Sequence, residues 1–280
     1  MHIPPHDNRN EPIVSADNDC VPLTYFNIVK LREGEGFEYS VPGYETCIVP
    51  ATGTIDVSVG NFSFHRLGNR TRDVWDGEPE GVYAPTGASV ILTCRSKQTE
   101  VFVAGARCDE VFEPFDVRSD QLDVVQYGSD ETKTHRKIKH ILGQNQAGRV
   151  GRLLVSELFT VGKGGWSGFP SHKHDTDRLP VETRHDETYN FRFRPRYGSG
   201  LQMLQREDNL PGDAYHIVDG STICLDRGYH PCVALPGYEM YYFTILGGLS
   251  QRGLVQYFQP THSEQLKTIP GILDMVAKFK

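Results

Sequence analysis

Short runs of alternating apolar and polar residues, each ended by a glycine or proline turn, recur along this chain. In "GTIDVSVGNFSF", Ile55, Val57 and Val59 alternate with polar residues before a turn at Gly60-Asn61. Side chains of a β-strand point to opposite faces in turn, so this pattern predicts a half-buried strand in a hairpin. The 280 residues also include 28 Gly, 17 Pro, 14 Phe and 13 Tyr. These features favour an all-β fold with many turns and little helix.

The two halves of the chain repeat one order of strands and turns. In the first half, "GVYAPTGASVILTC" and "EVFVAGA" predict a strand, a turn and two further strands. In the second half, "STICLDRGYHPCVALPGYEMYYFTILGG" predicts a strand, a turn, a strand, a Pro-Gly turn and a long apolar strand. Aligning the first turns by Gly87 and Gly228 places Ser89 opposite His230. We therefore expect two similar β-barrels, of which the second carries the chemistry.

The predicted division is an N-terminal barrel without a metal site at 1–130 and a C-terminal metal-binding barrel at 131–280. The segment from about Cys108 to Asn145 is charged and irregular, and we expect "SDETKTHRKIKH" within it to lie on the surface. Near the end of the chain, Pro270-Gly271 interrupts a helical pattern and leaves Ile272 to Phe279 as a short helix.

Charge and cysteine content narrow the class of protein. The formal net charge is −7 and no block of Lys or Arg stands out, which argues against nucleic acid or an anionic membrane as a partner. No stretch reaches about 18 consecutive apolar residues, and the N-terminus lacks a signal-peptide pattern. The six cysteines have no C-x-x-C spacing and are expected to be reduced thiols. We expect a soluble, cytoplasmic protein.

The stretch "SHKHD" places His172 and His174 one residue apart, just after the glycine-rich "GKGGWSGFP". On a strand these two imidazoles share a face. Later strands supply Glu187 in "HDETYNFRF" and His230 in "RGYHP". Neutral imidazoles together with a carboxylate make a mixed nitrogen and oxygen site for a divalent metal ion. The four residues predict one such ion in the second barrel, with zinc favoured and manganese, iron or nickel also suited.

Other histidines leave alternatives open. A His-x-His pair is also typical of two solvated polar residues on a strand. His185 lies two residues before Glu187 and shares its face, so it stays a second candidate ligand, whereas Asp186 between them points away. His65 and His216 stand near strand ends and are interpreted as ordinary polar residues.

Four stretches, "GGWSGFPSHKHD", "ETYNFRF", "DRGYHPCVALPGYEMYYF" and "DVWDGEPEGVYAPTG", carry a family resemblance. Together they resemble the 5-deoxy-glucuronate isomerases of inositol catabolism. These belong to a bicupin superfamily that also contains the 5-keto-4-deoxyuronate isomerases of pectin breakdown. The similarity covers roughly Tyr44 to Gly248. It implies a two-domain cupin with two jelly-roll barrels, and a metal in the C-terminal barrel held by three histidines and one glutamate. Transferred by motif, the ligands are His172, His174, Glu187 and His230.

The chain departs from the family pattern beside these ligands. Asn190 follows Tyr189 where a second tyrosine is usual, and Thr244 stands where an asparagine is usual. The segment Gln202 to Gln205 also differs from the usual Gln-Arg-Val-Tyr. These changes leave the ligand set intact and bear on the substrate, so a related isomerase for another sugar acid, or for a sulfonated or shortened sugar, is a second hypothesis.

Three further residues are candidates for catalysis. Tyr189 and Tyr242 lie on strands next to the ligands and are candidates for proton transfer or for orienting a hydroxyl group, although aromatic residues on a strand also fit a core. Asp175 directly follows the histidine pair, where it would either orient a ligand histidine or cap a turn. The substrate-binding candidates, for a carboxylate or hydroxyl groups, are Arg192, Arg206, Lys173 and Gln202.

The function predicted is a metal-dependent aldose–ketose isomerase. It would convert 5-deoxy-D-glucuronate to 5-dehydro-2-deoxy-D-gluconate through a metal-bound enediol. The rival hypotheses are an iron-dependent cupin oxygenase and a non-catalytic sugar-binding cupin. We expect a small sugar or sugar acid as the partner and a homo-oligomer as the assembly. The apolar strand "EMYYFTIL" fits either a core or a subunit interface.

Overall fold

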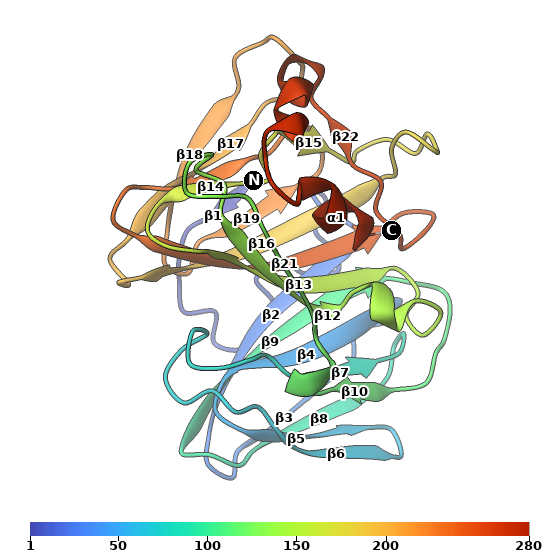
Figure 1. Ribbon diagram of the computed structural model, residues 1–280. Helices are drawn as coiled ribbons and strands as arrows, with labels where there is room; N and C mark the ends of the chain where they lie inside the picture. The colour runs from blue at the N-terminus through green and yellow to red at the C-terminus, as the bar shows by residue number, and fades with distance from the viewer. Residues whose placement is uncertain (280) are drawn as a thin grey trace.

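The computed structural model describes residues 1–279 and shows two β-barrels stacked on one another (Figure 1). Each barrel combines a larger sheet with a smaller one, and the two larger sheets meet in the middle of the molecule. Within residues 1–279, helix is confined to α1 (Ile272–Ala277) and the short 3-10 segments η1 (Ser119–Gln121), η2 (Gln144–Gln146) and η3 (Pro260–Lys267). The expectation of an all-β fold with little helix is confirmed. None of the helices in this range is long and apolar enough to span a membrane.

The N-terminal barrel is a sandwich of a five-stranded and a four-stranded sheet. The five-stranded sheet has the order β10 (Phe115–Val117), β7 (Gly81–Ala84), β4 (Tyr44–Thr52), β9 (Gln98–Arg107), β2 (Thr24–Arg32). The four-stranded sheet has the order β3 (Gly36–Tyr39), β8 (Val90–Cys94), β5 (Ile55–Val59), β6 (Phe62–Leu67). The predicted hairpin is β5 and β6, and Ile55, Val57 and Val59 are buried between the two sheets, as their spacing indicates.

The C-terminal barrel pairs a seven-stranded sheet with a four-stranded one. The seven-stranded order is β1 (His2–Ile3), β19 (Thr222–Leu225), β16 (His185–Arg194), β21 (Glu239–Gly248), β13 (Leu153–Thr160), β12 (Arg136–Leu142), β11 (Asp123–Tyr127). The four-stranded order is β14 (Gly165–Ser167), β20 (Cys232–Ala234), β17 (Ser199–Leu204), β18 (Asp213–Val218). A two-stranded ribbon joins β15 (His172–Lys173) to β22 (Tyr257–Phe258).

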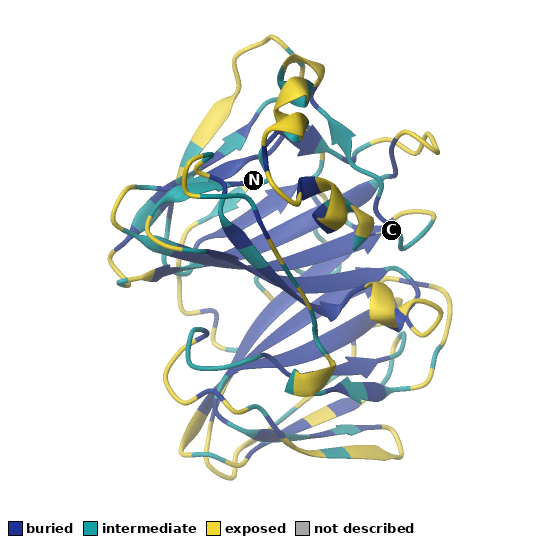
Figure 2. Cartoon of the chain, in the orientation of Figure 1, coloured by how far each residue is buried: buried dark blue, intermediate teal, exposed yellow. Residues whose placement is uncertain are grey.

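The two larger sheets pack face to face through an apolar layer. Phe243 of β21 lies 4.9 Å from Phe102 and 6.2 Å from Phe26, both in the N-terminal sheet, measured between ring centroids. The alternate residues Tyr242 and Leu246 of β21 belong instead to the core of the C-terminal barrel. Because both faces of β21 are covered, "EMYYFTIL" is core, and Figure 2 shows the central strands as the most deeply buried part of the molecule.

The expectation that "SDETKTHRKIKH" lies on the surface holds for its first part, where Asp130, Glu131 and Lys133 are exposed, and is wrong for its second part. Its second part is β12, which lies between β11 and β13 and is mostly buried. One of its charged side chains, that of Lys139, is buried against partners from other elements: it pairs with Glu78 at 2.9 Å and lies over the ring of Phe159. Local sequence contains no sign of such partners, since charge alone is typical of exposed residues.

The boundary at residue 130 stays a prediction, and Lys280, the last residue of the predicted C-terminal barrel, lies outside the described residues. Two strands that precede residue 130 pair with strands that follow it. Strand β11 pairs with β12, and β1 at the start of the chain pairs with β19. All six cysteines are free thiols, in agreement with their spacing.

Because His140 on β12 is buried, we expect the folded protein to lose stability in acid. Its ring is buried and contacts Ser156 at 2.8 Å, and burial lowers its pKa from 6.5 to about 4. Between these values the unfolded chain binds the proton more tightly than the folded one, so stability falls as the pH drops from about 6.5 to 4. We expect a loss of about 3 kcal/mol from this group. Urea unfolding across this range should show a smaller loss in His140→Gln, with the exposed His216→Gln as the control.

An equal loss of stability in His140→Gln and in the wild type would assign the acid sensitivity to other groups.

Candidate metal centre

Four buried side chains converge inside the C-terminal barrel. His172 belongs to β15, His174 follows it, Glu187 lies on β16, and His230 lies in the loop between β19 and β20. The ligand atoms of the three histidines lie within 4.8 Å of one another. Glu187 Oε2 lies 3.2 Å from His174 Nε2 and 3.2 Å from His230 Nε2. Three segments far apart in sequence thus bring together the four residues that the sequence predicts.

Backbone carbonyls orient the imidazoles. His174 Nδ1 lies 3.0 Å from the carbonyl of His185, and His230 Nδ1 lies 2.7 Å from the carbonyl of Gly228. A carbonyl only accepts a hydrogen bond, so Nδ1 of both rings carries the proton and donates it. Nε2 of both rings therefore faces the centre and Glu187. Such contacts between Nδ1 and a carbonyl are typical of metal-ligating histidines.

Three groups of the centre have pKa values shifted from their ordinary values: His172, His174 and Glu187. Burial lowers the pKa of His172 well below 6.5, and its two histidine neighbours lower it further. Burial opposes ionisation of Glu187, but the nearby His174 and His230 imidazoles outweigh burial and hold its pKa well below the ordinary value. Burial also acts against the charged form of His174, but Glu187 outweighs it and raises the His174 pKa. Glu187 therefore stays ionised, as a metal ligand must, and a bound cation would displace the proton that Glu187 favours on His174.

The loop that carries His230 is fixed from two sides. Asp175 accepts a hydrogen bond from the amide of Gly228 at 2.9 Å, and Gln202 Nε2 donates to the carbonyl of His230 at 2.8 Å. Gly228 has a φ of 94°, and a Cβ there would lie 2.7 Å from the carbonyl oxygen of Gln205, so the turn requires glycine. Asp175 therefore supports the ligand loop rather than contacting a ligand imidazole.

The cavity at the centre is small and mostly apolar. Its volume is about 40 Å³, and Tyr189, Tyr242 and Thr244 line it next to the ligands. The C-terminal segment covers it through side chains that include Phe258 and Met275. The C-terminal segment therefore forms one wall of the space beside the ligands.

The donor set fits a divalent metal ion. Three imidazole nitrogens and one carboxylate oxygen are the ligands that Zn²⁺, Mn²⁺, Fe²⁺ and Ni²⁺ take in proteins. His230 Nε2 is buried and makes no hydrogen bond within residues 1–279, although Glu187 lies near it. A buried ring nitrogen that faces two other imidazoles and a carboxylate is the feature expected of a ligand. The four residues would hold one ion.

His185 shares the face of Glu187, as its spacing predicts, but it has other partners. Its Nε2 lies 3.1 Å from the carbonyl of Arg252 and its Nδ1 lies 3.3 Å from Thr183 Oγ1. Asp186 points the other way and accepts a hydrogen bond from the amide of Leu23 at 3.0 Å. The structure therefore brings Glu187, and not His185, to the three imidazoles.

His65 and His216 lie away from the centre. His65 is exposed on β6 and pairs with Asp56, and His216 is exposed on β18. Their positions agree with the interpretation as ordinary polar residues.

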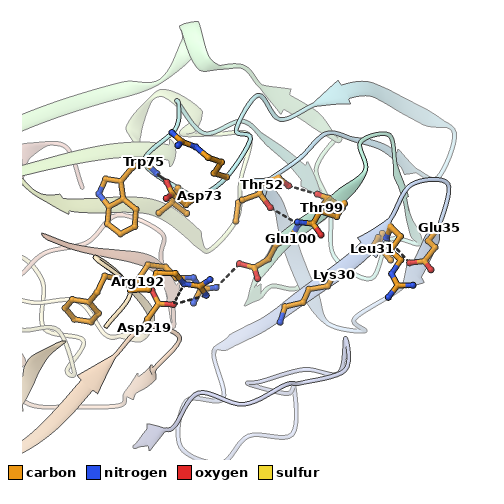
Figure 3. Close-up of a pocket in the computed structure, with 17 residues that line it drawn as sticks. Lys30, Leu31, Glu35, Thr52, Asp73, Trp75, Thr99, Glu100, Arg192 and Asp219 are labelled. Atoms are coloured by element: carbon orange, nitrogen blue, oxygen red, sulfur yellow. Dashed lines mark hydrogen bonds and ion pairs between the residues drawn. The ribbon is translucent and has the colours of Figure 1, made fainter. Parts of the chain in front are cut away.

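Three predicted substrate-binding cations lie away from this cavity. Arg192 points from the opposite face of β16 into a larger cleft of about 530 Å³ between the two barrels, where it pairs with Glu100 at 2.9 Å (Figure 3). Lys173 pairs with Asp175 at 2.6 Å, and Arg206 pairs with the partly exposed Asp226 at 2.8 Å. Each of these cations has an acidic partner and none lines the metal cavity, and their role in binding a carboxylate stays a prediction.

The two predicted tyrosines do line the cavity. The rings of Tyr189 and Tyr242 lie 4.6 Å apart between centroids. The Tyr242 hydroxyl lies 2.5 Å from Ser167 Oγ, and burial raises its pKa well above 10. Both tyrosines also belong to the apolar core of the barrel, as expected of aromatic residues on a strand. Their role in proton transfer or in orienting a hydroxyl group stays a prediction.

Sequence reasoning missed residues that only the fold brings to the site. Gln256 Nε2 lies 3.0 Å from His172 Nε2, and the Thr244 hydroxyl is buried against the cavity. Arg136 is buried at the edge of the same core. Gln256 lies outside the quoted motifs, and Arg136 stands in a charged segment that was expected on the surface. Thr244 alone carried a signal, as a departure from the family pattern.

Comparisons with known proteins identify named relatives of this chain. Curated relatives named 5-deoxy-glucuronate isomerase include one from Shouchella clausii, 29% identical over 83% of this chain and 85% of its own length. Another, from Listeria monocytogenes, is 27% identical over 81% and 82%.

Solved structures show the same fold. An IolB-like protein of Salmonella typhimurium LT2 superposes with a TM-score of 0.80 at 25% identity over 94% of both chains. Oxalate decarboxylase of Bacillus subtilis shares the fold at a TM-score of 0.60 and 9% identity, over 88% of this chain and 74% of its own. The expectation of a bicupin fold is confirmed. A family model described as KduI/IolB matches residues 2–265. The chain belongs to the KduI/IolB family.

Proposed function

We propose that this chain is a metal-dependent aldose–ketose isomerase that converts 5-deoxy-D-glucuronate to 5-dehydro-2-deoxy-D-gluconate. The observation that carries the proposal is the buried centre of His172, His174, His230 and Glu187, with the imidazoles oriented by backbone carbonyls. The relatives named 5-deoxy-glucuronate isomerase supply the substrate and reaction class, and an isomerase agrees with the expectation from sequence.

The reaction moves one proton between neighbouring carbons. A proton leaves the carbon that bears the hydroxyl group and returns to the former aldehyde carbon, while the hydroxyl proton passes to the former aldehyde oxygen. Atoms and electrons balance without an oxidant. A divalent ion bound at the centre would supply Lewis-acid stabilisation of negative charge on the substrate oxygens. The protein's task is to hold the substrate, exclude water and place groups that donate and accept protons.

Several residues of the cavity suit these tasks. The hydroxyl groups of Tyr242 and Thr244 can form hydrogen bonds with substrate oxygens, since both residues line the cavity. Ser167 contacts the Tyr242 hydroxyl and fixes its direction. The apolar wall, which includes Leu246 and Phe258, limits access of water to the reacting carbons.

The test combines metal removal with isotope exchange. Protein loaded with Zn²⁺, Mn²⁺ or Fe²⁺ is incubated without oxygen in D₂O with 5-deoxy-D-glucuronate. NMR should show one deuterium incorporated at the former aldehyde carbon of the product. Dialysis against a chelator should abolish turnover, and metal should restore it.

Other outcomes separate the rivals. An oxygen requirement would indicate an oxygenase. Tight binding of the sugar without exchange would indicate a binding protein. Exchange with a different sugar acid, and none with 5-deoxy-D-glucuronate, would retain the isomerase and change its substrate.

A further inference from the structure

Arg136 is the most unusual buried charge in the described part of the chain. It is fully buried, and its Nε, Nη1 and Nη2 atoms make no hydrogen bond within residues 1–279. Its neighbours across the sheet, Tyr127 on β11 and Thr160 on β13, are uncharged. The other buried arginine of the described residues, Arg70, lies at the contact between the two large sheets and is paired with Glu157 through two hydrogen bonds. A guanidinium ion is costly to bury without an anion, so folding alone does not explain Arg136.

The side chain of Arg136 shares a strand face with the metal cavity. Ile138, two residues along β12, points to the same face, and it lines the cavity. Tyr127, opposite Arg136 in the sheet, also lines it. Burial raises the pKa of Tyr127 to about 12, and the charge of Arg136 opposes that rise. Arg136 acts in the same way on Tyr242, a third residue of the cavity wall.

The core of the C-terminal barrel relates the guanidinium to the metal centre. Tyr127, Ile138 and Tyr242 belong to one core cluster, and all three line the cavity that also contains His172 and Glu187. Arg136 stands opposite Tyr127 on the same side of the sheet, so the guanidinium and the metal centre border the same core.

We propose that Arg136 binds the carboxylate of the sugar acid and selects substrates with an acidic group remote from the reacting carbons. The inference rests on the proposed function and names a specificity residue for it. A guanidinium has a planar pair of donors that matches a carboxylate, and in a buried site this contact is a charge-assisted pair. In 5-deoxy-D-glucuronate the carboxylate and the aldehyde are at opposite ends of a six-carbon chain. This separation corresponds to a site with the cation at one end and the metal ligands at the other.

The first experiment uses the wild-type, metal-loaded protein. Calorimetry compares gluconate, which has the carboxylate and no aldehyde, with sorbitol, its neutral counterpart. Gluconate should bind at least about 30-fold more tightly, because a buried charge pair contributes upwards of 2 kcal/mol. Equal affinities would overturn the proposal while leaving the isomerase intact, and this result does not depend on any variant folding.

The second experiment uses Arg136→Met and Arg136→Lys, with Arg192→Met as the matched control. Arg136→Met should lose the preference for gluconate, raise KM for 5-deoxy-D-glucuronate at least about 30-fold and keep its metal. Arg136→Lys should keep part of the preference, since it retains the charge without the planar donor pair. Arg192→Met should bind gluconate as the wild type does. A full preference in folded, metal-loaded Arg136→Met would contradict the proposal.

Thermal unfolding without sugar distinguishes a binding role from a structural one. An unpaired buried arginine replaced by methionine of similar length should leave Tm unchanged or raise it by about 2–4 °C. A large fall in Tm, together with unchanged gluconate preference in Arg136→Lys, would assign Arg136 a structural role instead.

Discussion

Replacing Glu187 by glutamine should abolish tight metal binding and lower kcat at least about 100-fold. The substitution keeps the size of the side chain and removes the negative charge that faces His174 and His230 at 3.2 Å. A neutral amide is a weaker ligand for a divalent ion, and three imidazoles alone leave the charge of the ion uncompensated. Metal content after dialysis, measured by mass spectrometry, and turnover at saturating substrate would check both effects.

His185→Gln is the matched control for this prediction. His185 lies on the same strand and the same face as Glu187, is equally buried, and contacts the Arg252 carbonyl. It should keep the metal at the stoichiometry of the wild type. If His185→Gln loses the metal and Glu187→Gln retains it, then the ligand on β16 is His185, and Glu187 is not part of the ligand set.

The residues of the candidate metal centre could be predicted from sequence because local rules place them. The alternation of side chains puts Glu187 and His185 on one face of β16, and the His-x-His pair is a short-range pattern. What separates Glu187 from His185 is long-range, since the partner of His185 is a carbonyl 67 residues away. The sequence therefore predicts the face of the strand. Only the fold shows that Glu187 on that face contacts the imidazoles, whereas His185 contacts the Arg252 carbonyl.

The residues that would bind the substrate could not be predicted from sequence, because the central strands are buried on both faces. On β16, nearly every residue from His185 to Phe193 is buried, so the residues of one face cannot be told from those of the other by polarity. Arg192 then looked as suitable as any cation, although it points to the inter-barrel cleft. Arg136 lies in a charged segment that looked exposed, and its burial depends on strands from elsewhere in the chain.

Removing Arg70 should destabilise the fold more than any other single change at the contact between the barrels. Its guanidinium donates to Glu157 Oε1 at 2.7 Å and to Oε2 at 2.6 Å, and both side chains are almost fully buried. Arg70→Met leaves the Glu157 carboxylate buried without its cation. Loss of one partner of such a pair costs about 3–5 kcal/mol, and urea unfolding should show a loss of this size.

The double variant Arg70→Met/Glu157→Gln tests the cause of that loss. The neutral amide removes the buried charge and can still accept the hydrogen bond that Tyr241 donates to Glu157 at 2.9 Å. Because the cost arises from the unpaired carboxylate, the double variant should recover most of the stability that Arg70→Met loses. If it stays as unstable as Arg70→Met, the loss comes from the packing of the Arg70 side chain and not from the charge. Metal content should stay at the wild-type value in both variants, because this pair lies on the face of the large sheet that points away from the metal.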